Sequence, residues 1–245
     1  RKSMVMRSRV AAMGGALAEA SDFADMRPRE IIKEGVSEYF LYTVEGHDTI
    51  PTGWSKRLPS FRSEKVPLAS FYKYDADRWG GQVMRFYRFK NERAANLGRE
   101  PLPDGSVKAF RTVSADGLLA FVGGTQTKYI PVDEQVDLDL GADPEVRVAP
   151  VLMNWEKVDI RFDDNGNVIG WTTRETWTVD IQNSKDIDVA LDMRRNFAGD
   201  WTLETKADFE KVDADTVKFV MPLKSREKRT ITYELITRHG SNVKR

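Results

Sequence analysis

The sequence predicts an all-β protein made of two packed β-sandwich subdomains of immunoglobulin-like type. Three observations predict this fold class. Many short segments alternate apolar and polar residues with a period of two, turn-forming residues separate these segments, and convincing helical patterns are scarce. A sandwich of seven strands takes about 100 residues, so the roughly 210 residues of β-pattern suggest two sandwiches.

The expected organisation has four parts. Residues 1–33 form an N-terminal arm or linker, because they are rich in Ala, Met and Arg and lack strand alternation. The first sandwich is expected over residues 34–143, the second over residues 144–238, and a short tail over residues 239–245.

The first half contains strand patterns rich in aromatic residues. Residues 37–44 carry apolar groups on both faces, which favours a strand buried on both sides. Further strands are expected at residues 66–75, 82–91, 105–113, 118–124 and 134–141. Asp77 to Gly81 supplies a turn, and the Asp-Gly pair at 116–117 predicts a hairpin. A short helix is expected over residues 91–98, ending at Gly98.

The second half alternates more cleanly. Strands are expected at residues 157–162, 171–182, 187–193, 216–221 and 229–237, with a turn at 163–167. In the expected strands at 171–182 and 187–193, the predicted core-facing side chains are Trp171, Trp177, Val179, Ile181, Ile187, Val189, Leu191 and Met193. The last two strands are expected to contribute Val217, Phe219, Met221, Ile231, Tyr233 and Leu235.

The composition excludes several classes of function. Lys+Arg and Asp+Glu balance at 38 each, so nothing in the total charge favours nucleic acid as a partner. There is no cysteine, which excludes disulfides, thiolate metal ligands and cysteine nucleophiles. No apolar run approaches the roughly 18 residues of a membrane helix, and no transmembrane segment is expected. The sequence predicts no cofactor, no metal and no catalytic residue.

Four segments resemble a known bacterial family when they are read together. They are EGVSEYFLYTV (34–44), FYRFKNERAANLGREPLPDGSVKAFRTVSADGLLAFVGG (86–124), TKYIPVDEQVDLDLG (127–141) and FEKVDADTVKFVMPLKSREKRTITYELITR (209–238). The chain resembles the C-terminal β domain of the mucoidy-inhibitor-type family, a domain of unknown function. This resemblance implies a β-rich domain that is periplasmic, on the cell surface or extracellular, and it implies no catalytic residue.

Aromatic residues gather between positions 54 and 89. Exposed aromatic faces stack on sugar rings and anchor protein interfaces, whereas buried ones build sandwich cores. Both interpretations remain open here. The candidate recognition surface consists of Trp54, Tyr72, Tyr74, Trp79 and Tyr87.

Charged clusters supply weaker candidates. Asp137, Asp139, Asp143 and Glu145 form either a solvated strand face or an acid/base pair. Asp163, Asp164, Asn165 and Asn167 form either a plain hairpin turn or part of a calcium loop. The C-terminal segment has an excess of basic residues, namely Lys224, Arg226, Lys228, Arg229, Arg238, Lys244 and Arg245, which either meet an acidic partner or protect an edge strand. His47 and His239 are interpreted as ordinary surface residues.

Three functions follow as hypotheses. The first is a non-enzymatic envelope or extracellular protein that acts through protein–protein recognition or self-assembly, with residues 1–33 contacting a protein partner or a second copy. The second is a carbohydrate-binding module that uses the aromatics of residues 54–89 to bind a cell-envelope glycan. The third is a hydrolase of envelope polymers that uses paired carboxylates.

Overall fold

The structure is a computed structural model that describes residues 31–36, 39–44, 47, 49–57, 61–114 and 116–244. Nearly all of its regular structure is β-strand, which confirms the predicted all-β fold. The chain divides into two compact units, residues 1–62 and residues 63–245. In the described part of the chain, no helix is long and apolar enough to cross a membrane.

The first unit contains one two-stranded antiparallel sheet. Strand β1 (Ile31–Val36) pairs with β2 (Tyr39–Val44), so that Ile31 lies opposite Val44. The expected strand at 37–44 is therefore confirmed over residues 39–44, residues 37 and 38 lie outside the described residues, and the burial of the strand on both faces stays a prediction. Residues 31–33, which were expected to end an arm, instead begin β1, where Ile31 and Ile32 supply β-branched side chains. Residues 1–30 of the expected arm lie outside the described residues.

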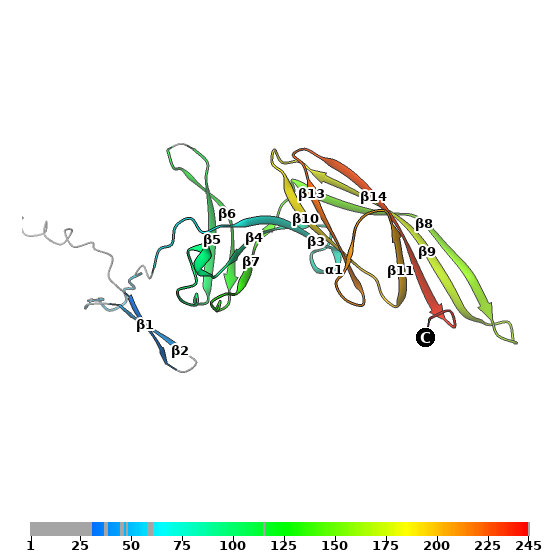
Figure 1. The fold of residues 1–245 in the computed structure, drawn as a ribbon, viewed down its shortest axis with the longest axis horizontal. Helices are drawn as coiled ribbons and strands as arrows, with labels where there is room; N and C mark the ends of the chain where they lie inside the picture. The colour runs from blue at the N-terminus through cyan, green and yellow to red at the C-terminus, as the bar shows by residue number, and fades with distance from the viewer. Residues whose placement is uncertain are drawn as a thin grey trace, which may run out of the picture. The chain divides into compact units, whose positions relative to one another are not determined.

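The second unit contains two large sheets that form a sandwich (Figure 1). The six-stranded sheet has the order β12–β13–β10–β3–β4–β7, and the four-stranded sheet has the order β11–β14–β9–β8. The strands of the first are β3 (Ala69–Asp75), β4 (Val83–Lys90), β7 (Gln135–Ala142), β10 (Val189–Asn196), β12 (Glu210–Lys211) and β13 (Thr216–Leu223). Those of the second are β8 (Val146–Phe162), β9 (Val168–Asn183), β11 (Asp200–Thr205) and β14 (Lys228–Gly240).

One apolar core lies between these two sheets. The six-stranded sheet contributes alternate residues of β10 and β13, and the four-stranded sheet contributes alternate residues of β8, β9 and β14. The fully or nearly fully buried side chains include Val148, Val179, Ile181, Val189, Leu191, Met193, Val217, Phe219, Leu223 and Tyr233. The predicted inward faces of these strands are thus confirmed, except at Ile187 and at Trp171, which is half-buried and lies outside the core cluster. Ile187 is exposed because it precedes β10, in a loop where the Asn183 side chain binds its carbonyl oxygen.

The six-stranded sheet crosses the expected boundary between residues 143 and 144. Strand β10, from the second predicted subdomain, pairs in parallel with β3, from the first, and Leu191 lies opposite Tyr72. The other pairings of this sheet are antiparallel. The two sequence halves therefore share main-chain hydrogen bonds within one sheet. Their assignment as separate immunoglobulin-like sandwiches stays a prediction.

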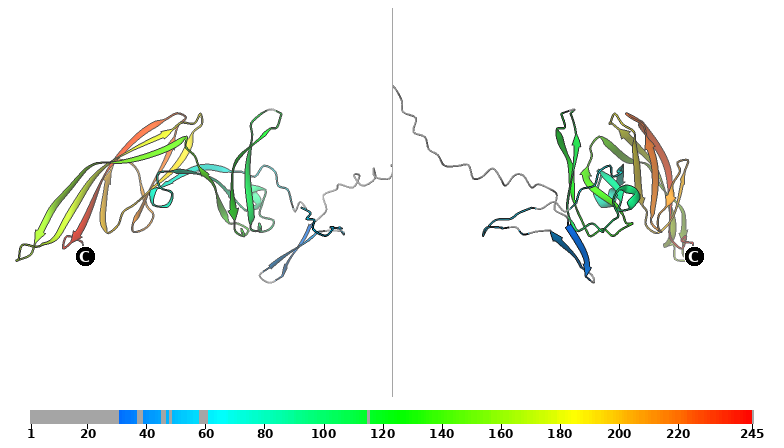
Figure 2. Two further views of the ribbon diagram at one scale, coloured as in Figure 1. Left: turned by 180° about the vertical axis from the view of Figure 1, so that it is seen from behind. Right: turned by 60° about the vertical axis from the view of Figure 1, so that its left-hand side comes forward.

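A third sheet is the predicted hairpin. Strands β5 (Gly105–Thr112) and β6 (Leu119–Thr127) pair antiparallel, and Gly117 takes the positive φ that its turn requires. The far end of the hairpin stands away from the two large sheets (Figure 2). Its base packs closely on β7, since a Cβ atom on Gly123 would lie 2.6 Å from the Leu140 carbonyl oxygen.

The two expected local elements between strands differ from prediction. The turn after β3 contains a single helical turn, α1 (Ala76–Trp79), whose first amides are capped by the Asp75 carboxylate. The helix expected at 91–98 shortens to a 3-10 turn, η1 (Arg93–Ala95). The chain leaves this turn early because Asn96 adopts a left-handed conformation and the Gly98 amide donates to the buried Asn91 side chain.

Asn91 holds this whole loop in place. Its Nδ2 donates to the carbonyl oxygens of Glu100 at 3.1 Å and Pro131 at 2.9 Å, while its Oδ1 accepts from Gly98 at 2.9 Å. The side chain is fully buried, so no water replaces these partners if it is removed.

At the C-terminal end, strand β14 continues to Gly240, so the expected tail begins two residues later than predicted. The turn at 163–167 is confirmed. Asp163 accepts from the amides of Asn165 and Asn167, and Gly166 has a positive φ.

We expect Asn91→Ala to lower the free energy of unfolding by about 3 kcal/mol, because it leaves buried donors and acceptors without partners. Urea denaturation followed by circular dichroism measures the change. Asn154→Ala, at an exposed position on β8, is the matched control and should change stability by less than about 0.5 kcal/mol. Equal effects of the two substitutions would show that Asn91 does not anchor the loop.

Candidate functional site

A pocket opens on the face of the four-stranded sheet that also carries the core. Its volume is about 430 Å³, which lies within the range of small-ligand sites. Three elements line it, namely β9 (Trp171, Thr173, Glu175, Trp177), β14 (Leu235, Thr237, His239) and the end of β10 with the following loop (Arg195, Asn196, Phe197, Ala198).

Strand register explains why these residues share one face. On β9 the odd-numbered residues point to the core side, where Val179 and Ile181 are covered by the six-stranded sheet. The same face continues toward Trp171, but β10 ends at Asn196, so nothing from that strand covers it. Figure 1 shows β8, β9 and the end of β14 running on past the strands of the six-stranded sheet. The unequal strand lengths therefore leave a stretch of the core face open.

Trp171 forms the outer wall of the pocket. The His239 ring lies directly across from it on β14 and stacks on it with a centroid distance of 4.9 Å and an interplanar angle of 18°. From β8, on the other side, the Lys157 ammonium lies 4.3 Å from the Trp171 ring centroid. His239 also lies 3.4 Å, Nε2 to Oγ1, from Thr173. These contacts orient the indole ring across the sheet.

Trp177 forms the inner wall. Its ring stacks on Tyr233 and receives the Arg195 guanidinium, whose central carbon lies 4.8 Å from the ring centroid. Its indole Nε1 donates to Glu175 Oε2 at 2.9 Å. Arg195 Nε donates to the Tyr233 hydroxyl at 2.9 Å. Burial raises the pKa of the Tyr233 phenol, so this hydroxyl stays neutral and can accept that hydrogen bond.

A third tryptophan extends this surface onto β8. Trp155 pairs with Glu175 in the β8–β9 ladder, and paired residues of adjacent strands point to the same side of a sheet. Trp155 is 52% exposed. We call Trp155, Trp171 and Trp177, together with the pocket that Trp171 and Trp177 line, the aromatic face.

Of the five residues predicted as a recognition surface, the structure buries two. Tyr72 and Tyr74 are only 2% exposed and belong to the core, so they cannot present their rings to a ligand. Trp79 and Tyr87 are half-buried on α1 and β4. Trp54 is 75% exposed but lies in the first unit. The alternation of β3 placed its tyrosines on the buried side.

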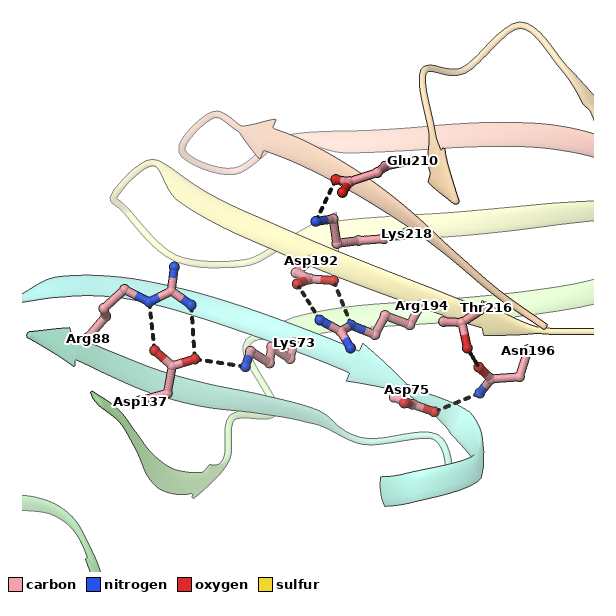
Figure 3. Close-up of polar contacts among 10 residues, drawn as sticks. All are labelled: Lys73, Asp75, Arg88, Asp137, Asp192, Arg194, Asn196, Glu210, Thr216 and Lys218. Carbon is pink, nitrogen blue, oxygen red and sulfur yellow. Dashed lines mark hydrogen bonds and ion pairs between the residues drawn. The ribbon is translucent and has the colours of Figure 1, made fainter. Parts of the chain in front are cut away.

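The acidic cluster of Asp137, Asp139, Asp143 and Glu145 is held by hydrogen bonds and ion pairs. It lacks the arrangement of a catalytic acid/base pair. Asp137 accepts two hydrogen bonds from Arg88, at 2.6 and 2.9 Å, and one from Lys73 at 3.0 Å (Figure 3). These bonds, led by the one from Arg88, hold the pKa of the Asp137 carboxyl below its ordinary value. A general acid needs a raised pKa, so Asp137 is unsuited to that role.

The other three carboxylates of this cluster have separate structural roles. Asp139 accepts from the amide of Gly141 within its own bend. Asp143 is buried against Lys185 at 2.9 Å and Arg85 at 3.6 Å, and Glu145 also pairs with Lys185.

In the possible calcium loop at residues 163–167, the Asp163 carboxylate is used in hydrogen bonds within the loop. The Asp163 carboxylate accepts from the amides of Asn165 and Asn167 and from the Asn167 side chain. Across the described residues, no group of three or more His, Cys, Asp or Glu side chains is placed to hold a metal ion.

The basic C-terminal segment is partly balanced by acidic residues from elsewhere in the chain. Lys224 pairs with Asp188, and Arg226 pairs with Asp186. Arg229 and Arg238 also have carboxylate partners, Glu227 and Asp200. The excess positive charge apparent from the local sequence is therefore reduced in the fold.

His239 was expected to be an ordinary tail residue, and this is wrong, because it lies on β14 inside the pocket. His47 is exposed. Sequence reasoning also missed Trp155, Glu175 and Arg195. One signal was available, since Thr173 and Glu175 are polar at positions that the alternation of β9 assigns to the core face.

We expect Asp137→Asn to destabilise the protein by about 1 kcal/mol at neutral pH, a modest value because the group is partly exposed. A lowered pKa contributes stability above the unfolded pKa of about 4, and this contribution is lost as pH falls through the folded pKa. The difference between wild type and variant should therefore shrink below about pH 4. Urea denaturation at pH 7 and pH 3 measures it, with Asp164→Asn as a control at an exposed position. A difference independent of pH would contradict the role of the ion pairs.

Comparisons of this chain with family models, with curated proteins and with solved structures find no match. The resemblance to the mucoidy-inhibitor-type domain therefore stays a prediction.

Proposed function

We propose that this protein is a non-enzymatic recognition module that binds a glycan on the aromatic face. The observation that carries the proposal is the placement of three tryptophans on one sheet face, two of them lining an open pocket and the third, Trp155, on the adjacent strand opposite Glu175 of the pocket. Aromatic rings stack on the apolar faces of sugar rings and remove those faces from water. Trp155 offers an exposed ring for such stacking.

The polar groups of the pocket match the hydroxyl groups of a sugar. Glu175 supplies acceptors, Arg195 supplies donors, and the Thr237 hydroxyl can do both. A sugar hydroxyl both donates and accepts, so it can use either kind of partner. Because stacking and hydrogen bonds already hold Trp171, Trp177 and Arg195, binding would cost little additional side-chain entropy.

The number of carboxylates in the pocket favours a binding function over a hydrolase. Among the residues described as lining the pocket, Glu175 is the single carboxylate, whereas most glycosidases use a pair. A lone carboxylate bound to a tryptophan N–H suits an acceptor of hydrogen bonds from a ligand.

A second candidate function is protein–protein recognition, the first of the sequence-based hypotheses. The β8–β9 hairpin exposes many large apolar side chains, namely Val151, Leu152, Met153, Trp155, Ile160, Phe162, Val168 and Ile169. Clusters of this kind mark interaction surfaces. Self-assembly through residues 1–33, and the periplasmic, cell-surface or extracellular location, remain predictions.

We expect Trp155→Ala to weaken binding of a glycan at least about tenfold, because truncating a central aromatic anchor commonly costs more than 1 kcal/mol. Screening on an array of neutral and acidic oligosaccharides, followed by calorimetric titration of each hit, measures the effect. Trp54→Ala is the matched control, since Trp54 is an exposed tryptophan of the other unit and should leave affinity unchanged. Absence of any glycan hit, or equal affinities of wild type and Trp155→Ala, would refute the proposal.

A further inference from the structure

Arg195 is the charged residue of the pocket that the fold leaves without a carboxylate. It lies on β10 and is half-buried. Its Nε donates to the Tyr233 hydroxyl, and its guanidinium lies over the rings of Trp177 at 4.8 Å and Phe197 at 6.0 Å. Within the described residues, no carboxylate oxygen lies within ion-pairing distance of it.

The neighbouring residue, Arg194, has a carboxylate partner. Arg194 points to the other side of β10, where it pairs with Asp192 (Figure 3). Most other arginines of the second unit's sheets, including Arg85, Arg88 and Arg238, also have a carboxylate partner. Among the described residues of these sheets, Arg111, Arg147 and Arg161 also lack a carboxylate partner, but Arg195 is the one of these four that lines the pocket.

The hydrogen-bonding edge of Arg195 remains available to a ligand. Its Nη1 and Nη2 have no acceptor among the described residues, while Nε and the flat face of the group are already used. A guanidinium fixed in this way presents a planar pair of N–H donors, and a carboxylate matches that geometry with two parallel hydrogen bonds.

The remaining charges of the pocket favour a ligand with one negative charge. Lys157 at the outer wall adds a positive charge, and Glu175 adds a negative one. Glu175 is held by the Trp177 indole, which keeps its acceptors available for hydroxyl groups.

We propose that the ligand of the aromatic face is an acidic sugar in which the exocyclic carbon is a carboxylate. Arg195 binds this carboxylate. The inference rests on the proposed glycan-binding function. In this arrangement, the sugar ring stacks on the exposed ring of Trp155, Glu175 and Thr237 bind hydroxyl groups, and Arg195 selects the acid.

The test uses matched pairs of methyl uronides and methyl hexosides in gluco, galacto and manno configuration, which differ only in the oxidation of the exocyclic carbon. Each sugar is titrated into the full chain, and the changes in nuclear magnetic resonance chemical shifts give its affinity. We expect at least one uronide to bind about tenfold or more tightly than its hexoside, with an affinity that falls as salt is raised.

Arg195→Gln should remove this preference, and Arg195→Lys should retain only part of it, because lysine keeps the charge but not the planar pair of donors. Arg194→Gln, on the opposite side of the same strand, is the matched control and should leave the preference intact. If Arg195→Gln fails to fold, Arg195→Lys and the salt dependence of the wild type carry the test.

The outcomes separate the two proposals. Equal binding of hexosides and uronides, or a preference that survives in Arg195→Gln, would overturn the role of Arg195 and leave glycan binding standing. Binding of neither series, together with an array that yields no hit, would overturn the proposed function as well. Binding of hexose phosphates in place of uronides would show that the site selects a different anion.

Discussion

The parallel pairing of β3 with β10 is the constraint on which the rest of the second unit depends. It sets Leu191 opposite Tyr72 and Met193 opposite Tyr74, and all four side chains are buried in the shared core. Strand β10 lies in the middle of its sheet, between β13 and β3, so its position joins strands from both ends of the unit. Because a parallel pairing cannot be closed by a short turn, this contact brings together segments that are distant in sequence.

The aromatic face follows from the unequal lengths of the facing strands. Strand β10 has 8 residues, whereas β8 and β9 have 17 and 16. The shorter strand covers Val179 and Ile181 but leaves Trp171 beyond its end, so one continuous sheet face is core at one end and lines an open pocket at the other. The side chains that cross this junction, Trp177 and Tyr233, contact both parts.

Alternation along single strands was enough to predict most of the strands and most of their buried faces, as in Val217, Phe219 and Met221. Such local periodicity reports which residues share a face, but not which strands become neighbours. The β3–β10 pairing was therefore out of reach, and with it the burial of Tyr72 and Tyr74. The site was missed for the same reason: Arg195 and His239 meet Trp177 and Trp171 only through tertiary register.

The open stretch of the sheet separates the demands of folding from those of the ligand binding proposed above. Residues at the outer end, such as Trp171, Thr237 and His239, lie past the cover of the six-stranded sheet, while main-chain hydrogen bonds between β9 and β14 hold their backbone. Their side chains can therefore vary in size and polarity with little penalty to the core. A sandwich of this kind could acquire new specificities through changes at one end of two strands, so related chains with the same framework are expected to differ most in what they bind.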